Sequence, residues 1–392
     1  MAGGNNGFHR YSHGHTDLVL AVSHNTDGTR AATASSDHRV KVWERDEASG
    51  QWSAIDTWIA HDAEVTDIRW TGPYVGEHLG TISEDGLLRI WQEDGTQPPH
   101  SGRRFRKLFE QVTATGVPYM CLDFKTLGTE TYLAAVTRDG YLSVFEPQDH
   151  DDLSAWQVMW SDYLCKYPSR MDETAFRLSW HKERVPAWPA VVAGLDRKSL
   201  GLAVAVGDMV KVFRTDRERK FYIGAVLDGA RALVRDVAWA NGSMRGYDLL
   251  ATASKDGFVR IYELHTPAAV GLPTSSFLQQ DPHIARRDSD HLQSSSPAVQ
   301  AAVRSGIGAG LAAGARGRRD EGASVVPGAI KQDAKLVAEL EVKGGGTPWR
   351  VSWSPLGDVL IASGDDGAVR LWKKAVDGKW LEAAEINATR GP

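Results

Sequence analysis

Two sets of residues in this chain combine a threonine, a histidine and an aspartate, the side-chain types of a nucleophilic catalytic site. In each set the aspartate lies four residues after the threonine, and a tryptophan follows six residues later. The members are His15, Thr33, Asp37 and Trp43 in the first set and His61, Thr81, Asp85 and Trp91 in the second. Because an active site needs only one copy, the recurrence favours a structural role: a buried hydrogen-bond relay in which every polar group is paired.

The alternative is an enzyme that uses His15 and Thr33 as active groups. In that case Thr33→Ala abolishes turnover without loss of stability, whereas a relay predicts a loss of about 1–3 kcal/mol for an unpaired buried group. No other motif favours catalysis. Gly344-Gly-Gly346-Thr347 lacks the lysine of a phosphate-binding loop, and the 13 histidines show no metal-ligand spacing. We therefore expect no catalytic residue, no cofactor and no metal.

Composition narrows the class of protein further. The chain has 392 residues, a net charge of −5 and two cysteines, Cys121 and Cys165. A mildly acidic chain is a poor candidate for gripping nucleic-acid phosphates, so no direct nucleic-acid binding is expected. Two cysteines cannot form a disulfide framework or a four-thiolate zinc site. The first 15 residues lack an apolar signal core, and no run reaches 18 apolar residues, so we expect a soluble, intracellular protein.

A repeat organises the elements around these sets. Six segments alternate apolar and polar residues and close on an aromatic residue: Arg39–Trp43, Leu87–Trp91, Tyr141–Phe145, Val210–Phe213, Phe258–Tyr262 and Ala368–Trp372. Such alternation is typical of a strand. Asp-Gly precedes four of them, at 85–86, 139–140, 256–257 and 366–367. This dipeptide predicts a two-residue hairpin turn with positive φ at both residues.

Each repeat contains four predicted strands. Two come before the closing-aromatic strand, as in Trp349–Ser354 and Val359–Ser363 of the last repeat, and one follows it, as in Trp380–Asn387. Six repeats of four antiparallel strands predict an all-β fold, a six-bladed WD40-type β-propeller. The fourth repeat is the weakest, because Trp188-Pro-Ala190 interrupts its first strand pair.

The repeat also predicts the domain boundaries. Blades one to five occupy residues 14–263, and residues 335–388 complete blade five and form blade six, with a tail at 389–392. Between them, residues 264–334 are rich in Ser, Ala, Gly and Arg and nearly lack aromatics, which predicts a disordered insertion within blade five. Residues 1–13 are predicted to hold a further extended strand around Phe8–Tyr11.

That further strand has no sheet of its own, because six complete blades already account for the others. A lone strand exposes unpaired backbone groups. The simplest solution is that a second chain contributes strands and builds a seventh blade with it, so that the ring of this chain alone is open. The alternative is a closed six-bladed ring with a frayed N-terminus.

The sequence resembles a known family of propeller proteins. Ala31–Trp43 followed by Gly50-Gln-Trp52 resembles the first blade of the Sec-homologue nucleoporins, and Trp349–Trp353 with Ala362–Lys373 resembles their last blade. The resemblance covers about 8–264 and 335–388. It implies an open propeller in the Y-shaped scaffold complex of the nuclear pore, where an α-solenoid nucleoporin inserts a seventh blade. It also implies a role in a vacuolar or lysosomal coat for nutrient signalling, and it includes a more distant likeness to the Sec-type vesicle-coat propeller.

The resulting hypothesis is a non-catalytic scaffold subunit of a multi-subunit coat at the nuclear envelope, associated with membranes only through the complex. The residues predicted to contact the partner blade are Phe8, Arg10, Tyr11, Leu18, Leu20, Trp349 and Val351. The rival hypotheses are a closed-ring WD40 recognition module, which binds peptides on its top face, and a Sec-type vesicle-coat propeller.

Overall fold

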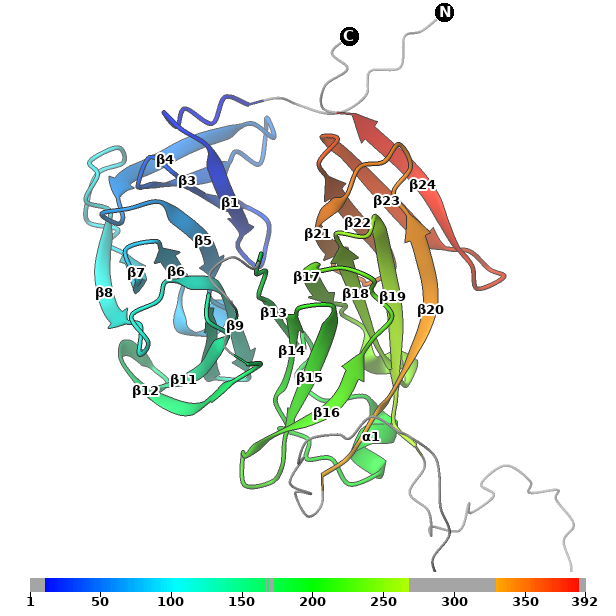
Figure 1. Cartoon of the computed structure of the whole chain (residues 1–392). Coiled ribbons are helices and arrows are strands. Elements are labelled where there is room, and N and C mark those ends of the chain that lie inside the picture. Colours follow the sequence, from blue (N-terminus) through cyan, green and yellow to red (C-terminus); the bar gives the residue numbers. More distant parts are fainter. Residues whose placement is uncertain (1–10, 167, 169–172, 268–328, 388–392) are drawn as a thin grey trace, which may run out of the picture. The chain divides into compact units, whose positions relative to one another are not determined.

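A computed structural model of the chain describes residues 11–166, 168, 173–267 and 329–387. Within these residues, 24 strands form six separate four-stranded antiparallel sheets (Figure 1). Each sheet is built from consecutive strands in chain order. The predicted all-β, six-bladed propeller is therefore confirmed.

The blades follow one another along the chain. Blade one holds β1 (Val19–His24), β2 (Arg30–Ser35), β3 (Arg39–Arg45) and β4 (Trp52–Ile59). Blade two holds β5 (Val65–Trp70), β6 (His78–Ser83), β7 (Leu87–Glu93) and β8 (Phe105–Val112). Blade three holds β9 (Tyr119–Leu127), β10 (Glu130–Thr137), β11 (Tyr141–Asp149) and β12 (Asp152–Tyr163). Blade four holds β13 (Arg177–Trp180), β14 (Gly201–Val206), β15 (Met209–Thr215) and β16 (Phe221–Leu227).

Blade five holds β17 (Val234–Trp239), β18 (Asp248–Ser254), β19 (Phe258–His265) and β20 (Asp333–Glu341). Blade six holds β21 (Pro348–Trp353), β22 (Val359–Gly364), β23 (Ala368–Lys374) and β24 (Trp380–Asn387). The outer strand β24 has the bounds predicted from the sequence, because the preceding closing-aromatic strand and turn specify it locally.

Each blade has two apolar faces, since successive side chains of a strand point to opposite sides of the sheet. In blade five, one face packs against blade six through fully buried residues: Ala251, Ala253, Val259 and Ile261. The opposite face packs against blade four through Leu250, Tyr262 and Leu264. The core is thus a series of layers between blades rather than one central cluster.

The Asp-Gly turns differ from the prediction. Among the described residues Gly86, Gly140, Gly257 and Gly367 have positive φ, but the aspartates before them do not. In blade two the N–H of Gly86 donates to the carbonyl of Ser83, and the Asp85 carboxylate accepts from the N–H of Leu87. The turn therefore needs only one left-handed residue, because the aspartate side chain holds the other half of the turn.

Blade four contains a short helix that the sequence did not predict. Helix α1 (Trp188–Val192) lies in the connection between β13 and β14, where a strand interruption was expected. Pro189 stands in its first turn, a position that tolerates proline because that N–H has no helical partner.

The two chain ends that flank the insertion are fixed in the core. His265 at the end of β19 pairs with Asp333 at the start of β20. The Gln332 amide donates to Thr266 Oγ1 at 3.2 Å, and its oxygen accepts from Arg214 Nε at 2.9 Å. Arg214 is fully buried and forms an ion pair with Asp248 at 2.6 Å. The insertion is thus carried by the connection of a β-hairpin. The predicted disordered segment, residues 264–334, is too wide at both ends, because residues 264–265 and 333–334 pair as strands; its residues 268–328 lie outside the described residues.

Replacing residues 268–328 by a short Gly/Ser linker should leave the propeller folded. The hairpin register and the Arg214–Gln332–Thr266 contacts lie entirely within retained residues, and a shorter loop lowers the entropy cost of closure. We expect a thermal midpoint within about 3 °C of that of the full chain. A much larger decrease, measured by circular dichroism, would mean that the insertion contributes to the core.

Candidate functional site

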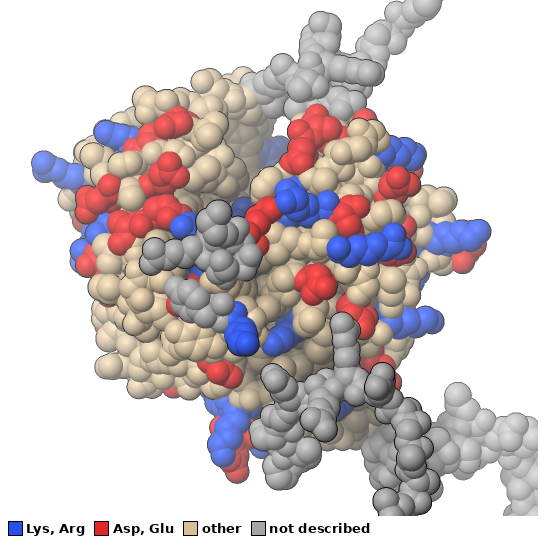
Figure 2. Space-filling view, in the orientation of Figure 1, with Lys and Arg blue, Asp and Glu red and all other residues tan. Residues whose placement is uncertain are grey.

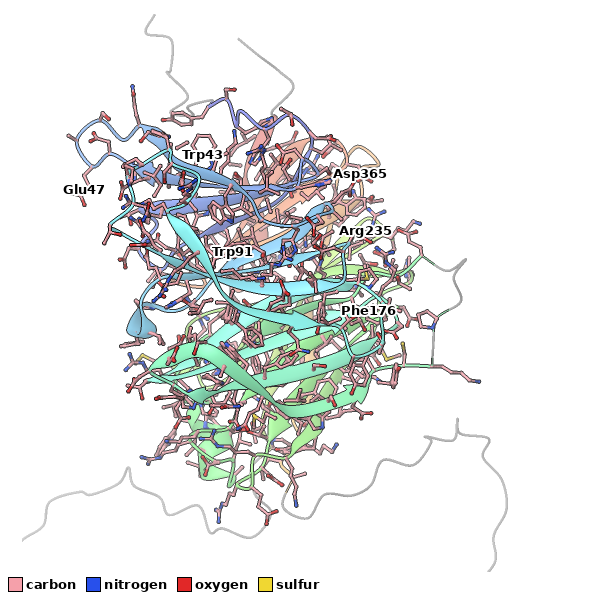
Figure 3. All side chains as sticks on the ribbon, turned by 90° about the vertical axis from the view of Figure 1, so that its left-hand side faces the viewer. Trp43, Glu47, Trp91, Phe176, Arg235 and Asp365 are labelled. Carbon is pink, nitrogen blue, oxygen red and sulfur yellow. The ribbon has the colours of Figure 1, made fainter. Side chains whose placement is uncertain are left out.

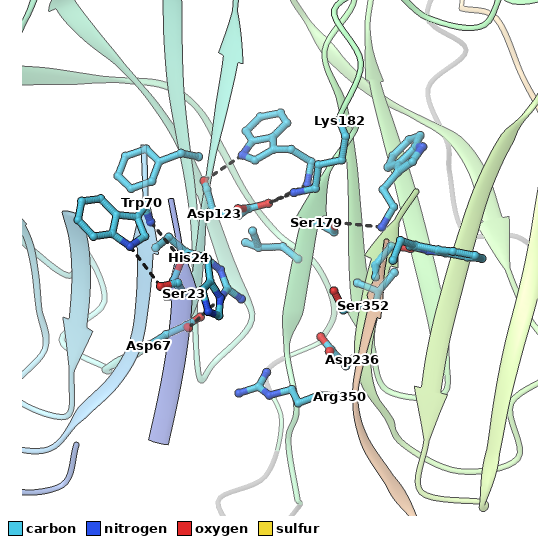
Figure 4. A pocket seen from close by; sticks show the side chains of 18 of the residues that line it. Ser23, His24, Asp67, Trp70, Asp123, Ser179, Lys182, Asp236, Arg350 and Ser352 are labelled. Carbon is cyan, nitrogen blue, oxygen red and sulfur yellow. Dashed lines mark hydrogen bonds and ion pairs between the residues drawn. The ribbon is translucent and has the colours of Figure 1, made fainter. Parts of the chain in front are cut away.

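The inner strands of the blades, β1, β5, β9, β13, β17 and β21, line a central channel. Its cavity has a volume of about 910 Å³ and is walled by side chains from all six inner strands (Figure 4). In the space-filling view the surface is hollowed between the blades at the left and those at the right (Figure 2). On the same face acidic and basic side chains are interspersed, and neither sign forms one large patch.

Four successive positions of each inner strand can be compared from blade one to blade six. Position one holds Ala21, Asp67, Cys121, Arg177, Asp236 and Arg350. Position two holds Val22, Ile68, Leu122, Leu178, Val237 and Val351. Position three holds Ser23, Arg69, Asp123, Ser179, Ala238 and Ser352. Position four holds His24, Trp70, Phe124, Trp180, Trp239 and Trp353.

Hydrogen bonds between position three of one blade and position four of the next join neighbouring inner strands. The Trp70 backbone N–H donates to Ser23 Oγ at 3.3 Å, and its indole N–H donates to the Ser23 carbonyl at 3.2 Å. Trp180 makes the same two bonds to Asp123, and the Trp239 N–H donates to Ser179 Oγ at 3.1 Å (Figure 4). At these three junctions a polar residue on one blade meets an aromatic residue on the next, whereas at the junction of blades five and six Ala238 contributes only its backbone carbonyl, which accepts from the Trp353 indole.

The sequence of inner-strand contacts does not run around the whole ring. Strand β1 packs on β5, β5 on β9, β9 on β13, β13 on β17 and β17 on β21. Among the described residues, β21 and β1 have no comparable packing (Figure 1). Blade one and blade six therefore each present one face that no other described blade covers to the same degree.

The uncovered face of blade six is built like the covered faces of the other blades. Strand registers match Ile361, Ser363, Val369 and Leu371 to Ala251, Ala253, Val259 and Ile261 of blade five. All four blade-five residues are fully buried against blade six, whereas their blade-six counterparts are only partly buried. An apolar surface of this kind marks a site of interaction.

The uncovered face of blade one shows the same difference at position two. Val22 is 49% exposed, whereas the position-two residues of blades two to six are at most 6% exposed, each packed on the preceding blade. Val22 has the residue type of a core position, but among the described residues no preceding blade buries it.

The residues predicted to bind a partner blade lie in different environments. Phe8 and Arg10 lie outside the described residues. Tyr11, Leu18 and Trp349 are 44%, 70% and 48% exposed, respectively, and Leu20 is partly buried. Val351 is nearly buried in the layer between blades five and six, so its side chain faces blade five rather than the uncovered face.

The sequence prediction missed the four residues of the blade-six face, Ile361, Ser363, Val369 and Leu371, and it missed Val22. The sequence does contain a pattern that could have identified them: each occupies an alternating strand position whose counterparts in other blades are apolar core residues. The alternation alone does not tell which blade lacks a neighbour.

Both threonine–histidine–aspartate sets form connected relays. In blade two, His61 Nδ1 lies 2.9 Å from Asp85 Oδ2, His61 Nε2 lies 2.8 Å from Thr81 Oγ1, and the Trp91 indole donates to the same hydroxyl at 2.9 Å. In blade one the corresponding three distances, which join His15, Asp37, Thr33 and Trp43, are 2.9, 2.9 and 3.0 Å. Figure 3 labels Trp43 and Trp91 on their neighbouring blades.

Burial shifts the relay histidines toward the neutral form. Burial lowers the pKa of His61 below its usual value although Asp85 opposes the shift, and the same holds for His15 with Asp37. Burial alone would raise the pKa of Asp85, but His61 and the N–H of Leu87 bring it below the ordinary range. Because the threonine hydroxyl lies between an imidazole nitrogen and an indole N–H, the arrangement pairs buried polar groups with one another.

The described residues contain no group of three or more metal-ligating side chains. Among the helices that the structure describes, none combines the length and apolar character needed to cross a membrane. What the site offers chemically is two apolar sheet faces beside a polar channel.

Six four-stranded blades, with relays in two of them, define the chain as a WD-repeat β-propeller. A family model described as "WD domain, G-beta repeat" matches residues 8–44 and 335–373. Over 96% of its length the chain is 28% identical to Nucleoporin SEH1 of Saccharomyces cerevisiae, of which it covers 99%. It is 27% identical to Nucleoporin SEH1 of Chaetomium thermophilum, over 96% of this chain and 94% of that protein. It is also 27% identical to Nucleoporin SEH1 of Homo sapiens, over 93% of this chain and 84% of that protein.

The chain is thus similar over nearly its whole length to proteins named Nucleoporin SEH1. The resemblance inferred from the first and last blades is thereby confirmed, and it extends over more of the chain than those segments.

Thr81→Val should destabilise the chain by about 1–3 kcal/mol, because it leaves the His61 nitrogen and the Trp91 indole without their shared partner in a buried site. Valine has nearly the same shape, so packing is preserved. Urea unfolding measures the difference. The matched control is Thr129→Val on an exposed turn of blade three, which should change stability by less than about 0.5 kcal/mol. Equal effects of the two substitutions would contradict the relay.

Acidification should lower stability between about pH 7.5 and about pH 5.5. The folded-state pKa values of His15, His61 and His181 all lie below their usual values, mainly through burial. The unfolded chain therefore takes up more protons in this range, so the free energy of unfolding falls as pH falls. Thermal midpoints across the range measure the slope, and a flat or inverse slope would contradict buried neutral histidines.

Proposed function

We propose that this chain is a non-catalytic scaffold subunit of the nuclear pore that binds an α-solenoid nucleoporin, which inserts a seventh blade between blades six and one. The ring of the chain alone is then open. The chain supplies two apolar sheet faces, and the partner supplies the strands that cover both of them.

The observation that carries the proposal is the exposure of Val22. A residue of core type, at a position at most 6% exposed in the five other blades, is 49% exposed here. The partly buried Ile361, Val369 and Leu371 on blade six support the same interpretation from the other side. Closure of blade six directly on blade one would bury both faces, so their exposure weighs against a closed-ring recognition module.

Similarity to named nucleoporins supports the nuclear pore as the location. The relatives carry the name nucleoporin, and the chain covers 84–99% of the length of the three relatives compared above. A constituent of the pore assembles with other subunits, which suits a protein with two uncovered faces. The same two faces would accept a similar blade from another donor, which is how a vacuolar or lysosomal coat would use the chain.

The relays support a structural rather than a catalytic role. Each threonine hydroxyl is already shared by a histidine and a tryptophan, and in blade two it is fully buried. A substrate could not reach this hydroxyl without displacing its present partners. This geometry favours architecture over nucleophilic chemistry.

Val22→Arg and Ile361→Arg should each weaken assembly at least about tenfold, because a charge would be buried in an apolar layer. The measurement is co-purification, at high salt, of this chain with the α-solenoid nucleoporins of its own organism after co-expression. Salt is informative because apolar burial persists where surface ion pairs weaken.

The matched control is Val158→Arg on the outer strand of blade three, where Val158 is 56% exposed. It should not affect assembly. All three variants should unfold within about 1 kcal/mol of the parent, since their side chains are at least partly exposed. Undiminished capture of a solenoid nucleoporin by both seam variants would overturn the proposal.

A further inference from the structure

The charges at position one of the inner strands are paired around the channel until blade six. Asp67 lies 3.3 Å from Arg177 and 3.7 Å from Arg69, and the Asp236 carboxylate accepts from the N–H of Val351 at 2.9 Å. Arg350 differs from these residues. Among the described residues its guanidinium makes no hydrogen bond and no ion pair within 4 Å, and it points into the channel (Figure 4).

Position-three side chains serve the blade that follows their own, and so does Asp236 at position one, whereas Arg177 contacts Asp67 and the Met120 carbonyl on preceding blades. Asp236 of blade five accepts from blade six, Ser23 of blade one from blade two, and Asp123 of blade three from blade four. By the position-three geometry, Ser352 of blade six is directed at a blade that this chain does not supply, and the Arg350 guanidinium lies in the channel beside it without a partner of its own among the described residues. Ser352 is exposed, in keeping with that position.

Arg350 is poorly compensated where it stands. Burial lowers its pKa below the usual arginine value, and the positive charge of Arg177 acts in the same direction. A guanidinium cannot lose its proton to relieve this cost near neutral pH, so an added carboxylate would be favourable.

The position-four tryptophans indicate a second residue that the inserted blade would need. Trp70, Trp180 and Trp353 each donate an indole N–H to the position-three carbonyl of the preceding blade, at 3.0–3.2 Å. The corresponding carbonyl on blade six is that of Ser352. Two other junctions have a serine at position three: at Ser23 the Trp70 indole donates to the serine carbonyl, whereas at Ser179 only the backbone N–H of Trp239 is bonded, to the serine hydroxyl. The junction of blades one and two is therefore the precedent for the full pair of bonds.

We infer that the inner strand of the inserted blade carries an acidic residue that pairs with Arg350 and, three residues later, a tryptophan that donates to the Ser352 carbonyl. This inference rests on the proposed function, and it defines the partner by chemistry: an edge strand with the pattern acidic–apolar–any–tryptophan. Blade two of this chain has that pattern, Asp67-Ile-Arg-Trp70.

Blade two therefore provides a probe. Strand registers match Ile59 at the end of β4 to Asn387 at the end of β24. A second copy of residues 60–113 placed directly after Asn387 repeats the native connection from blade one to blade two. The full chain then carries its own seventh blade, with Asp67 and Trp70 of the copy facing Arg350 and Ser352.

Four versions separate the requirements. The first keeps the copy unchanged, the second carries Asp67→Arg in the copy, the third adds Arg350→Asp to the second, and the fourth carries Trp70→Phe in the copy. We expect the first to raise the thermal midpoint by about 3 °C or more, and the third to regain what the second loses. The fourth should retain only part of the increase.

Occupancy of the seam is measured independently with Val22→Cys in every version. A bulky thiol reagent should label this cysteine in the chain without a copy and label it at least about tenfold more slowly wherever the copy is seated. If the cysteine is protected but all versions melt alike, the pairing with Arg350 is wrong and the open ring stands. If the unchanged copy protects nothing, the proposed function itself fails.

Discussion

Every blade of this propeller depends on having a neighbour on each of its two faces. The layers between blades contain the small and β-branched residues that strand alternation places on opposite sides of each sheet. A covered layer excludes water completely, as at Ala251 and Ile261, whereas the equivalent Ile361 and Leu371 remain partly in water. Because a linear array of six blades has two ends, one face of blade one and one face of blade six can be buried only by a segment outside the six blades and otherwise stay in contact with water. The apolar composition of those faces favours burial.

The two ends are not stabilised in the same way. Blade one contains a complete relay, in which Thr33 joins His15 to the Trp43 indole, so its strands are tied together by polar contacts that need no outside partner. Blade six has an alanine, Ala362, at the threonine position and is tied to blade five instead. Trp353 donates to the Ala238 carbonyl, and the Arg235 guanidinium lies 3.8 Å from the centre of the Trp349 ring (Figure 3 labels Arg235). Both ends are therefore bonded to their neighbour, blade one through Ser23 and Trp70, but only blade one also contains a relay of its own.

Local patterns predicted most of the fold, and the remaining part depends on contacts between distant residues. An alternating run closed by an aromatic places β3, β7 or β23 to within a residue or two, because its information lies inside the strand. The turn at Asp85-Gly86 was assigned the wrong backbone, since the dipeptide is compatible with two turns and the side-chain bond to Leu87 decides between them. Helix α1 was missed because Pro189 breaks a strand pattern and also suits a first helical turn. Val351 was assigned to the seam because alternation gives two faces without saying which of them meets blade five.

The same limitation explains why Val22 and Ile361 were not singled out. Their residue types are those of the core, and nothing in a strand records whether the neighbouring blade belongs to the same chain. The information appears only when equivalent positions are compared in three dimensions, where one valine out of six position-two residues is exposed. Arg350 is a polar residue at the same seam. Its positive charge lies near two other arginines, Arg177 and Arg69, and near two carboxylates, Asp67 and Asp236, so the chain itself does not balance it. Apolar burial at Val22 would favour any strand of suitable shape, whereas a strand that covered the partly buried Arg350 guanidinium without bringing a carboxylate would be disfavoured. Affinity and selectivity at the seam would thus come from different residues.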